Sequence, residues 1–286
     1  MKTCREYIDE YKAEGKAIGH FNIATLDMLW GITDAARSLT VPVIIGLSEG
    51  ERDFVGLQQA VLLVKSIRTQ YDIPLFINAD HTYSVERVKE AIDAGFDSVI
   101  FDGAQLSFEE NIKATKECVT YARMSGRDVL VEGELGYIGT SSKLLDELPD
   151  NAAVTTESMT QPDEARQFVE ETGVDLLAPA VGNVHGKLKH APNPALDIGR
   201  IKEILQEARV PLVLHGGSGV SDADFTQAAK AGMNIIHVST ELRIAWKEAL
   251  LQEITTSSEL AAYRLLKPAH EAIARVATER LSLFNM

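Results

Sequence analysis

Short apolar runs alternate with amphipathic stretches along the whole chain. The apolar runs are nearly continuous and rich in Val, Ile and Leu, which is typical of strands in a parallel sheet that is buried on both faces. The stretches between them, such as SVERVKEAIDAG and DEARQFVEETG, have a helical period, and several end on glycine, as helices commonly do. The predicted strands span residues 17–23, 41–48, 74–80, 98–103, 129–136, 176–182, 211–217 and 234–240.

Eight strands that each lead into a helix predict an α/β protein with a single closed (β/α)8, or TIM, barrel. A doubly wound open sheet is the alternative architecture. No Gly/Ser-rich linker or change in composition divides the chain, so we expect one barrel domain over residues 1–286. Residues 137–156 are long and weakly periodic, which predicts an active-site loop, and residues 257–286 predict a C-terminal helical segment.

Composition and charge narrow the range of partners. The 286 residues carry 28 basic and 42 acidic side chains, a formal net charge of −14, and no basic cluster stands out. This balance argues against nucleic acid as a partner. The negative net charge still allows a phosphorylated small molecule to bind, provided that backbone amides, a helix N-terminus or a metal supply local positive potential.

Other features of the composition concern location. No apolar run approaches the roughly 20 residues of a membrane span, so we expect no membrane partner. The charged start, MKTCREYIDEYKAEGK, lacks the apolar core of a signal peptide. Two isolated cysteines form no disulfide framework, which suits a reducing compartment. We therefore expect a cytoplasmic protein.

Polar residues gather at the ends of the predicted strands, where a (β/α)8 barrel places its active site. Four of the seven histidines fall at these ends, whereas His20 lies inside the first strand and His190 and His270 fall at predicted surface or helix positions. The stability of an apolar barrel does not explain such a rim. The polar residues at strand ends are Asn22, Ser48, Asp80, His81, Asp102, Glu132, Glu134, His185, His215 and His237.

Three of these histidines predict a catalytic metal site. His81, His185 and His215 follow three different strands, and three imidazoles with an open position are a common catalytic zinc arrangement. A single histidine beside glycine is more often hydrogen-bonded structure, but the three together favour a metal. We interpret Asp102 and Glu132 as partners of the ligands or as an alternative metal position. Buried carboxylates that accept backbone N–H bonds are the open alternative for these two.

Asp80 directly precedes His81, and neighbours on a regular strand point to opposite faces. Both side chains reach one site only if the strand ends there and the chain bends. The cost of burying either group requires a partner or a metal. We therefore expect an irregular strand end at this pair.

The loops after the last two predicted strands predict a phosphate site. They read HGGSG at 215–219 and HVSTEL at 237–242, and they contain Gly216 and Val238. In this fold these loops often bind phosphate through backbone N–H groups, which need glycine for close approach. Aldol cleavage needs an electrophile, which is either a Schiff base on a lysine or a metal ion. None of the predicted strand runs contains a lysine, so a metal is the better candidate.

With these residues, the chain resembles the class II, zinc-dependent fructose-bisphosphate and tagatose-bisphosphate aldolases. The likeness covers essentially the whole chain, and its motifs in order are GHFNI, VPVIIGLSEG, NADH, AGFDSVIFDGAQLSFEENI, VEGELG, GVDLLAPAVGNVHG, VPLVLHGGSGV and YRLLKPAHEAIARV. The resemblance implies Asp80 as the catalytic acid/base. It implies His81, His185 and His215 as zinc ligands, with Asp102 and Glu132 as carboxylates near the metal. The substrate-binding residues that it implies are Asn22, Ser48, Gly186, Gly216, Gly217, Ser218, His237, Val238, Ser239 and Thr240.

The same resemblance implies the reaction and the partners. Asp80 takes a proton from the C4 hydroxyl of fructose 1,6-bisphosphate, the C3–C4 bond breaks, and Zn2+ stabilises the enediolate as glyceraldehyde 3-phosphate leaves. A second acid then reprotonates the carbanion to give dihydroxyacetone phosphate. The resemblance also implies a monovalent cation, Na+ or K+, at Gly186 and Gly217, and a homodimer or homotetramer as the assembly.

Three departures from the family pattern leave the substrate open. His237 stands where the family usually has asparagine, Ala104 changes the family's DGS to DGA, and LGYIGTSSKLLDEL lacks the usual Gly-Gly-x-Glu-Asp loop. Asp146, Glu147 or Asp150 is a candidate for the missing loop acid. The alternatives are therefore an aldolase for tagatose 1,6-bisphosphate or another ketose phosphate, and a non-catalytic barrel that binds sugar phosphates.

Overall fold

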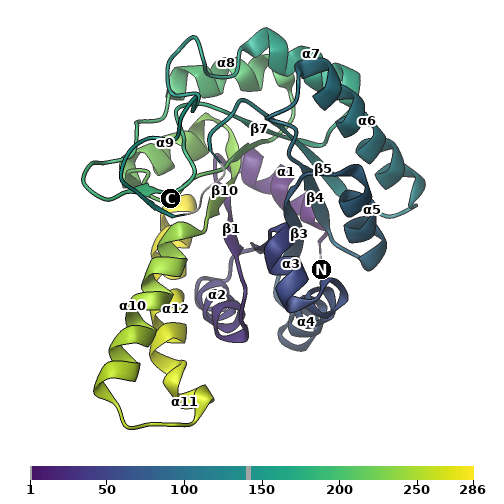
Figure 1. Ribbon diagram of the computed structural model, residues 1–286. Coiled ribbons are helices and arrows are strands. Elements are labelled where there is room, and N and C mark those ends of the chain that lie inside the picture. The colour runs from purple at the N-terminus through teal and green to yellow at the C-terminus, as the bar shows by residue number, and fades with distance from the viewer. Residues whose placement is uncertain (1, 140–142) are drawn as a thin grey trace.

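A closed parallel barrel forms the centre of the molecule (Figure 1). The computed structural model describes residues 2–139 and 143–286. Within them, eight strands close in the order β1-β10-β9-β7-β5-β4-β3-β2, which confirms the predicted barrel over the open sheet. The barrel strands are β1 (Ile18–Asn22), β2 (Val43–Leu47), β3 (Leu75–Thr82), β4 (Ser98–Phe101), β5 (Leu130–Leu135), β7 (Leu176–Pro179), β9 (Leu212–Leu214) and β10 (Met233–Val238). Each of them overlaps one of the predicted apolar runs.

Helices cover the outside of the barrel, and the main apolar core lies between them and the strands. After β1 comes α2 (Leu26–Leu39), and after β2 come α3 (Glu49–Val55) and α4 (Leu57–Tyr71). The next strands are followed by α5 (Val85–Ala94), α6 (Phe108–Met124), α7 (Pro162–Thr172), α8 (Ile198–Ala208) and α9 (Asp222–Ala231). The chain ends with α10 (Thr240–Thr256), α11 (Ala262–Leu265) and α12 (Lys267–Phe284).

The first helix, α1 (Cys4–Glu14), closes one end of the barrel. It begins at Thr3, whose side chain forms a capping box with Glu6. Its apolar side chains, among them Ile8, pack into a buried cluster with residues near the beginnings of the strands, such as Ile18 and Phe76. The N-terminal ends of the strands are thus covered by apolar packing, and the C-terminal ends are left for a site.

The predicted C-terminal helical segment corresponds to α11 and α12. Figure 1 shows α10 and α12 as neighbouring helices that project beyond the barrel, with α11 at their tip. At its other end α12 buries Leu281 and Phe284 in the main core. The helix also lies close to α2, because a Cβ atom on Gly31 would be 2.8 Å from the carbonyl oxygen of His270.

The predicted active-site loop contains a short strand of its own. β6 (Leu144–Leu145) pairs in parallel with β8 (Lys187–Leu188), which follows β7, to form a separate two-stranded sheet. Residues 140–142 of this loop lie outside the described part of the chain. No helix among the described residues is long and apolar enough to cross a membrane.

Candidate active site

Asp80 and His81 lie at an irregular end of β3, as the sequence requires if both are to reach one site. The pairing of β3 with β4 shifts register between Ala79 and Thr82. His81 has a φ of +28°, a conformation that is sterically unfavourable for a residue with a Cβ atom. The bend turns the two neighbouring side chains toward the same region, where an aspartate oxygen and His81 Nε2 are 3.9 Å apart.

Arg52, which the sequence analysis missed, stabilises this bend. It is 1% exposed on α3, and its guanidinium donates to the carbonyl oxygens of Leu47 at 2.7 Å and Asp80 at 2.9 Å. It also donates to Thr82 Oγ1 at 3.0 Å. Arg52 therefore ties the end of β2 to both sides of the bend in β3.

Three imidazoles meet beside this bend, and each comes from a different part of the rim. His81 is on β3, His185 is in the loop after β7, and His215 directly follows β9. One ring nitrogen from each histidine lies within 4.8 Å of the other two. The structure therefore brings together the three histidines that the sequence proposes as metal ligands.

Two carboxylates fix the orientation of these rings. His81 Nδ1 lies 2.8 Å from Asp102 Oδ2, and His215 Nε2 lies 2.8 Å from Glu132 Oε1. Because an ionised carboxylate only accepts hydrogen bonds, each of these outer nitrogens carries the hydrogen. The inner nitrogens, His81 Nε2 and His215 Nδ1, then face each other at 3.1 Å, a distance that requires a proton or a metal cation between their lone pairs.

The third ring completes a set of nitrogen atoms that suits a divalent cation. His185 Nε2 is buried and has no hydrogen-bond partner among the described residues. Converging ring nitrogens repel one another unless a proton or a metal cation lies between them. Three imidazoles with carboxylate partners behind them fit Zn2+, and they would also accept related divalent ions.

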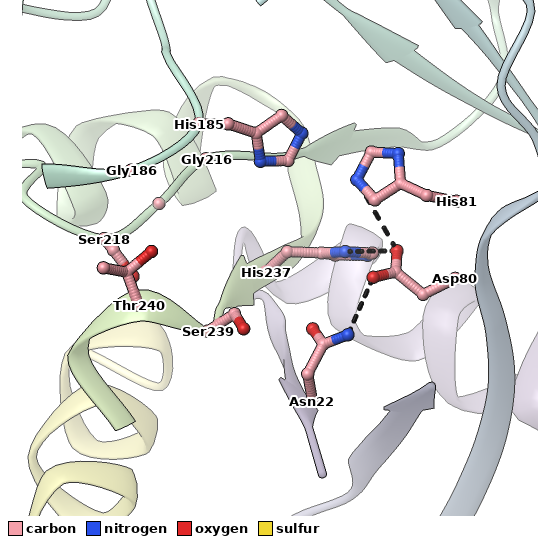
Figure 2. Close-up of a pocket in the computed structure, with 11 residues that line it drawn as sticks. Asn22, Asp80, His81, His185, Gly186, Gly216, Ser218, His237, Ser239 and Thr240 are labelled. Atoms are coloured by element: carbon pink, nitrogen blue, oxygen red, sulfur yellow. Dashed lines mark hydrogen bonds and ion pairs between the residues drawn. The ribbon is translucent and has the colours of Figure 1, made fainter. Parts of the chain in front are cut away.

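The two oxygens of Asp80 differ in their surroundings (Figure 2). Asn22 Nδ2 donates to Oδ2 at 2.8 Å, whereas Oδ1 is buried without a hydrogen-bond partner among the described residues. Oδ1 lies 3.9 Å from His81 Nε2 and 3.5 Å from His237 Nδ1, both longer than an ordinary hydrogen bond. Asn22 therefore fixes the carboxylate while one oxygen keeps its lone pairs available.

The protonation states suit a base beside a metal site. Burial alone would raise the pKa of Asp80, but His81 and His237 hold it well below its usual value. Burial would lower the pKa of His81, but Asp80 and Asp102 raise it to about 10. Burial lowers the pKa of His185 well below its usual value, so this ring is neutral and able to act as a ligand. At neutral pH Asp80 is thus an ionised carboxylate in a buried site.

Glu134 lies close to the same cluster. Its Oε2 is 3.6 Å from His81 Nδ1 and has no hydrogen-bond partner among the described residues. Burial, followed by the charge of Asp102, raises the pKa of Glu134 to about 8. At neutral pH Glu134 is therefore a neutral carboxyl group, and a cation bound nearby would favour its ionised form.

A pocket next to the imidazoles has the features of an anion site, and we call it the phosphate pocket. It is lined by Asn22, Asp80, His81, His185, Gly186, Gly216, Gly217, Ser218, His237, Ser239 and Thr240. Figure 2 shows Ser218 and Thr240 on one side of this pocket and Asp80 on the other, with His237 between them. The N-terminus of α10 begins here, and Ser239 Oγ is buried without a hydrogen-bond partner in the described chain. Helix N-termini and unpaired hydroxyl groups favour phosphate.

The glycine loop of this pocket depends on residues without side chains. Gly216 has a φ of +64°, and a Cβ atom there would lie 2.4 Å from the carbonyl oxygen of Val184. A Cβ atom on Gly217 would lie 2.5 Å from the carbonyl oxygen of His237. Glycine at positions 216 and 217 therefore lets this loop approach both the loop after β7 and the end of β10.

A second pocket, which we call the outer pocket, adjoins the first. The two share Asn22, Asp80, His81 and His185, and the outer pocket adds Ser48, Glu49, Gly50, Tyr83 and Arg243. Asp80 and two of the proposed ligands thus lie between the two pockets. A long ligand could occupy both pockets and present its middle to Asp80.

Glu51 connects the residues of the outer pocket, and the sequence analysis did not single it out. It accepts from Asn22 Nδ2 at 2.9 Å and from Ser48 Oγ at 2.9 Å, and it pairs with Arg243 at 2.7 Å. Ser48 begins α3, and the S-x-x-E pattern of residues 48–51 is a recognised capping signal. That pattern was sufficient to predict the contact between Ser48 and Glu51.

The remaining predicted residues lie around the pockets in different ways. Val238 is fully buried in the main core, which leaves only its main chain to face a ligand. Asp146 pairs with Lys189 at 2.8 Å, and neither Glu147 nor Asp150 lines the pockets described above. The structure thus identifies no replacement for the loop acid among these three described residues.

Comparisons with known proteins agree with this geometry. The family model described as "Fructose-bisphosphate aldolase class-II" matches residues 2–286. Fructose-bisphosphate aldolase of Staphylococcus aureus (strain Mu50) is 36% identical over 289 residues, which cover 100% of this chain and 97% of the relative. The crystal structure of the YdjI aldolase from Escherichia coli K12 superposes with a TM-score of 0.83 at 32% identity, covering 98% and 96% of the two chains. A putative fructose-1,6-biphosphate aldolase from Coccidioides immitis gives a TM-score of 0.83 at 26% identity, covering 98% and 95%. The chain belongs to the class II fructose-bisphosphate aldolase family.

Proposed function

We propose that this protein is a divalent-metal-dependent aldolase that reversibly cleaves fructose 1,6-bisphosphate. The observation that carries this proposal is the convergence of ring nitrogens from three histidines beside Asp80 Oδ1, which has no hydrogen-bond partner in the described chain. This arrangement joins a site for a Lewis acid to a base within one buried volume. Membership of the class II aldolase family supports the same chemistry.

His81, His185 and His215 would hold Zn2+, and Asp102 and Glu132 would keep two of the rings in the ligand tautomer. When bound there, the ion supplies a Lewis acid that draws negative charge away from the ketose oxygens. No lysine lines either of the two described pockets, so a Schiff base has no candidate nucleophile in them. The residues therefore support the metal-dependent route.

Asp80 would act as the base. Its Oδ1 accepts the proton of the C4 hydroxyl, the C4 oxygen forms the aldehyde of glyceraldehyde 3-phosphate, and the C3–C4 bond breaks. The electron pair of that bond stays on C3, and protonation of C3 yields dihydroxyacetone phosphate. Asn22 would hold Asp80 Oδ2 throughout, so that the carboxylate keeps its orientation during proton transfer.

The two pockets would bind the two ends of the substrate. The phosphate pocket, with its glycine loop, serine hydroxyls and the N-terminus of α10, would take the phosphate of the dihydroxyacetone half. The outer pocket, which contains Ser48 and Arg243, would take the other end. A Na+ or K+ ion near Gly186 and Gly217 remains part of this proposal.

A second candidate substrate is tagatose 1,6-bisphosphate, which differs from the first at C4. His237 Nδ1 lies 3.5 Å from the Asp80 oxygen that must meet the C4 hydroxyl, so this residue is well placed to influence the choice of epimer. The two substrates share the chemistry and differ in kcat/KM. A panel of ketose phosphates measured with one enzyme preparation distinguishes them.

The proposal is tested by a coupled cleavage assay on the purified protein. We expect EDTA to abolish cleavage of fructose 1,6-bisphosphate and Zn2+ or Co2+ to restore it. Borohydride in the presence of substrate should trap no covalent adduct, since no Schiff base forms. Activity that survives EDTA and is trapped by borohydride would contradict the proposal. Metal and phosphate binding without turnover on any ketose phosphate would instead identify a non-catalytic barrel.

A further inference from the structure

His20 is a buried histidine that the proposed function does not use. It lies in the middle of β1, is 1% exposed and lines neither the phosphate pocket nor the outer pocket. Its Nδ1 has no hydrogen-bond partner among the described residues. Burying an imidazole in a barrel interior is costly compared with an apolar side chain, so its contacts need an explanation.

The contacts of His20 fix its ring in one plane. The ring stacks on that of His237 with centroids 3.4 Å apart and an interplanar angle of 2°. His20 Nε2 lies 3.1 Å from Asn78 Oδ1, and Asn78 Nδ2 donates to Ser98 Oγ at 2.8 Å. Since the amide nitrogen of Asn78 is used by Ser98, its oxygen is the acceptor and His20 Nε2 carries the hydrogen.

Strand β2 packs against the edge of the His20 ring. A Cβ atom on Gly46 of β2 would lie 2.0 Å from His20 Cε1, so only glycine leaves room for the imidazole. His20 is thus confined by β2 at its edge, by Asn78 at Nε2 and by His237 on its face. Residues from β1, β2, β3 and β10 together form one packed unit around it.

The packed unit around His20 extends to Asp80, the proposed base. His237 Nδ1 faces Asp80 Oδ1 at 3.5 Å, beyond the 2.7–3.2 Å of an ordinary N–H···O hydrogen bond. At this distance an N–H group on His237 stabilises the ionised carboxylate through a long, weak contact, and Oδ1 keeps a lone pair that can accept the substrate proton. A ring free to tilt would either form a short hydrogen bond to Oδ1 or move away from it. Both changes would slow proton abstraction.

We propose that His20 is a positioning residue that acts through His237, holding its ring so that Nδ1 keeps its long contact with the oxygen of Asp80 that takes the proton. This inference rests on the proposed aldolase function for its kinetic consequence. Its structural part, the dependence of the His237 ring on His20, is independent of the substrate.

Three variants test the inference in the Zn2+-loaded protein. His20→Ala removes the stacked ring, Gly46→Ala forces the ring aside without removing it, and the double variant relieves that clash. We expect each single variant to lower kcat about tenfold or more, with KM and bound metal within twofold of the wild type, since a small misplacement near the reacting atoms is costly. The double variant should lose no more than His20→Ala alone, because both changes act through one ring.

Ile45→Ala is the matched control, because Ile45 is buried in the main core on the neighbouring strand β2 and lines neither pocket. We expect it to lower the Tm while leaving kcat unchanged. If His20→Ala and Gly46→Ala keep the wild-type kcat, or if bound metal falls in proportion to kcat as it does when part of the protein is unfolded, the positioning role is wrong.

A readout without substrate separates this inference from the proposed function. In protein labelled with 15N-histidine, we expect His237 as the Nδ1–H tautomer and His20 as the Nε2–H tautomer, and His20→Ala should convert the His237 signals to a mixture. Unchanged His237 signals in His20→Ala would overturn the inference even in an active aldolase. A changed tautomer in a protein that cleaves no ketose phosphate would support the inference and reject the proposed function.

Discussion

Replacement of Arg52 by methionine removes the guanidinium that ties β2 to the bend carrying Asp80 and His81. Methionine retains most of the apolar volume but none of the donors. The carbonyl oxygens of Leu47 and Asp80 then lose partners at 2.7 and 2.9 Å, and Thr82 Oγ1 loses one at 3.0 Å. Because Arg52 is 1% exposed, solvent does not replace these bonds without local opening.

The expected loss of stability follows from the two carbonyl groups that lose their hydrogen-bond donor. A buried acceptor left unsatisfied costs about 1–3 kcal/mol, so the two together cost about 2–6 kcal/mol of the free energy of unfolding. A typical domain has only about 5–15 kcal/mol, so we expect the variant to be substantially destabilised, and its activity is compared only under conditions where it is folded. The φ of +28° at His81 is no longer enforced, so we also expect the ligand to move and cleavage to weaken by tenfold or more.

Arg200→Met is the matched control, because Arg200 is also a buried arginine. It is 9% exposed, donates to Thr160 O at 3.0 Å and to Gln161 Oε1 at 2.8 Å, and lines neither pocket of the site. Urea unfolding gives the stability of each variant, and kcat and bound Zn2+ are measured where both are folded. If Arg52→Met and Arg200→Met lose stability alike and both keep full activity and metal, the reasoning about the bend is refuted.

The other predictions concern the base, a ligand partner and a thiol. Asp80→Asn should retain metal and lower kcat by about 10²–10⁴, the usual contribution of a general base, and a loss below tenfold would reject Asp80 in this role. Asp102→Asn should weaken Zn2+ binding by about 10–100-fold, measured by competition with a chelator, because His81 loses the carboxylate that fixes its tautomer. Burial raises the pKa of Cys118 to about 12 from a usual value near 8.5, so at pH 8 the folded protein should resist iodoacetamide that modifies the urea-unfolded chain. Rapid labelling of the folded protein at Cys118 would show that α6 opens readily.

Much of the fold was predictable because each barrel strand is a local signal. Runs such as VPVIIGLS and PLVLHGG have the continuous apolar character of strands covered on both faces, and their order fixes the barrel. The fold then places the carboxyl ends of the strands at one rim, so His81 and His215 could be assigned to one site without coordinates. The predicted cytoplasmic location and the homodimer or homotetramer stay predictions.

The contacts that tune the site were not predictable from sequence patterns. Arg52 lies on α3 with the spacing of an ordinary helix residue, and only the packing of α3 against β3 shows that it reaches the bend. His20 lies inside the first strand, and the sequence analysis assigned it no role. Its stacking on His237 depends on the register of β1 with β10, which pairs residues more than 200 positions apart along the chain.

The two ends of the barrel show where this protein accepts a cost in stability. At the N-terminal end, α1 covers the strands with apolar side chains. At the other end, Asp80 Oδ1, Glu134 Oε2 and His185 Nε2 are buried without partners among the described residues, and His81 has a strained backbone. An apolar group in place of each unpaired polar atom would make the folded state more stable. Folding alone therefore does not explain why these polar atoms are concentrated at one rim. A bound cation would satisfy the ring nitrogens of the three histidines, and a substrate hydroxyl would satisfy Asp80 Oδ1, so these polar groups are preorganised for both.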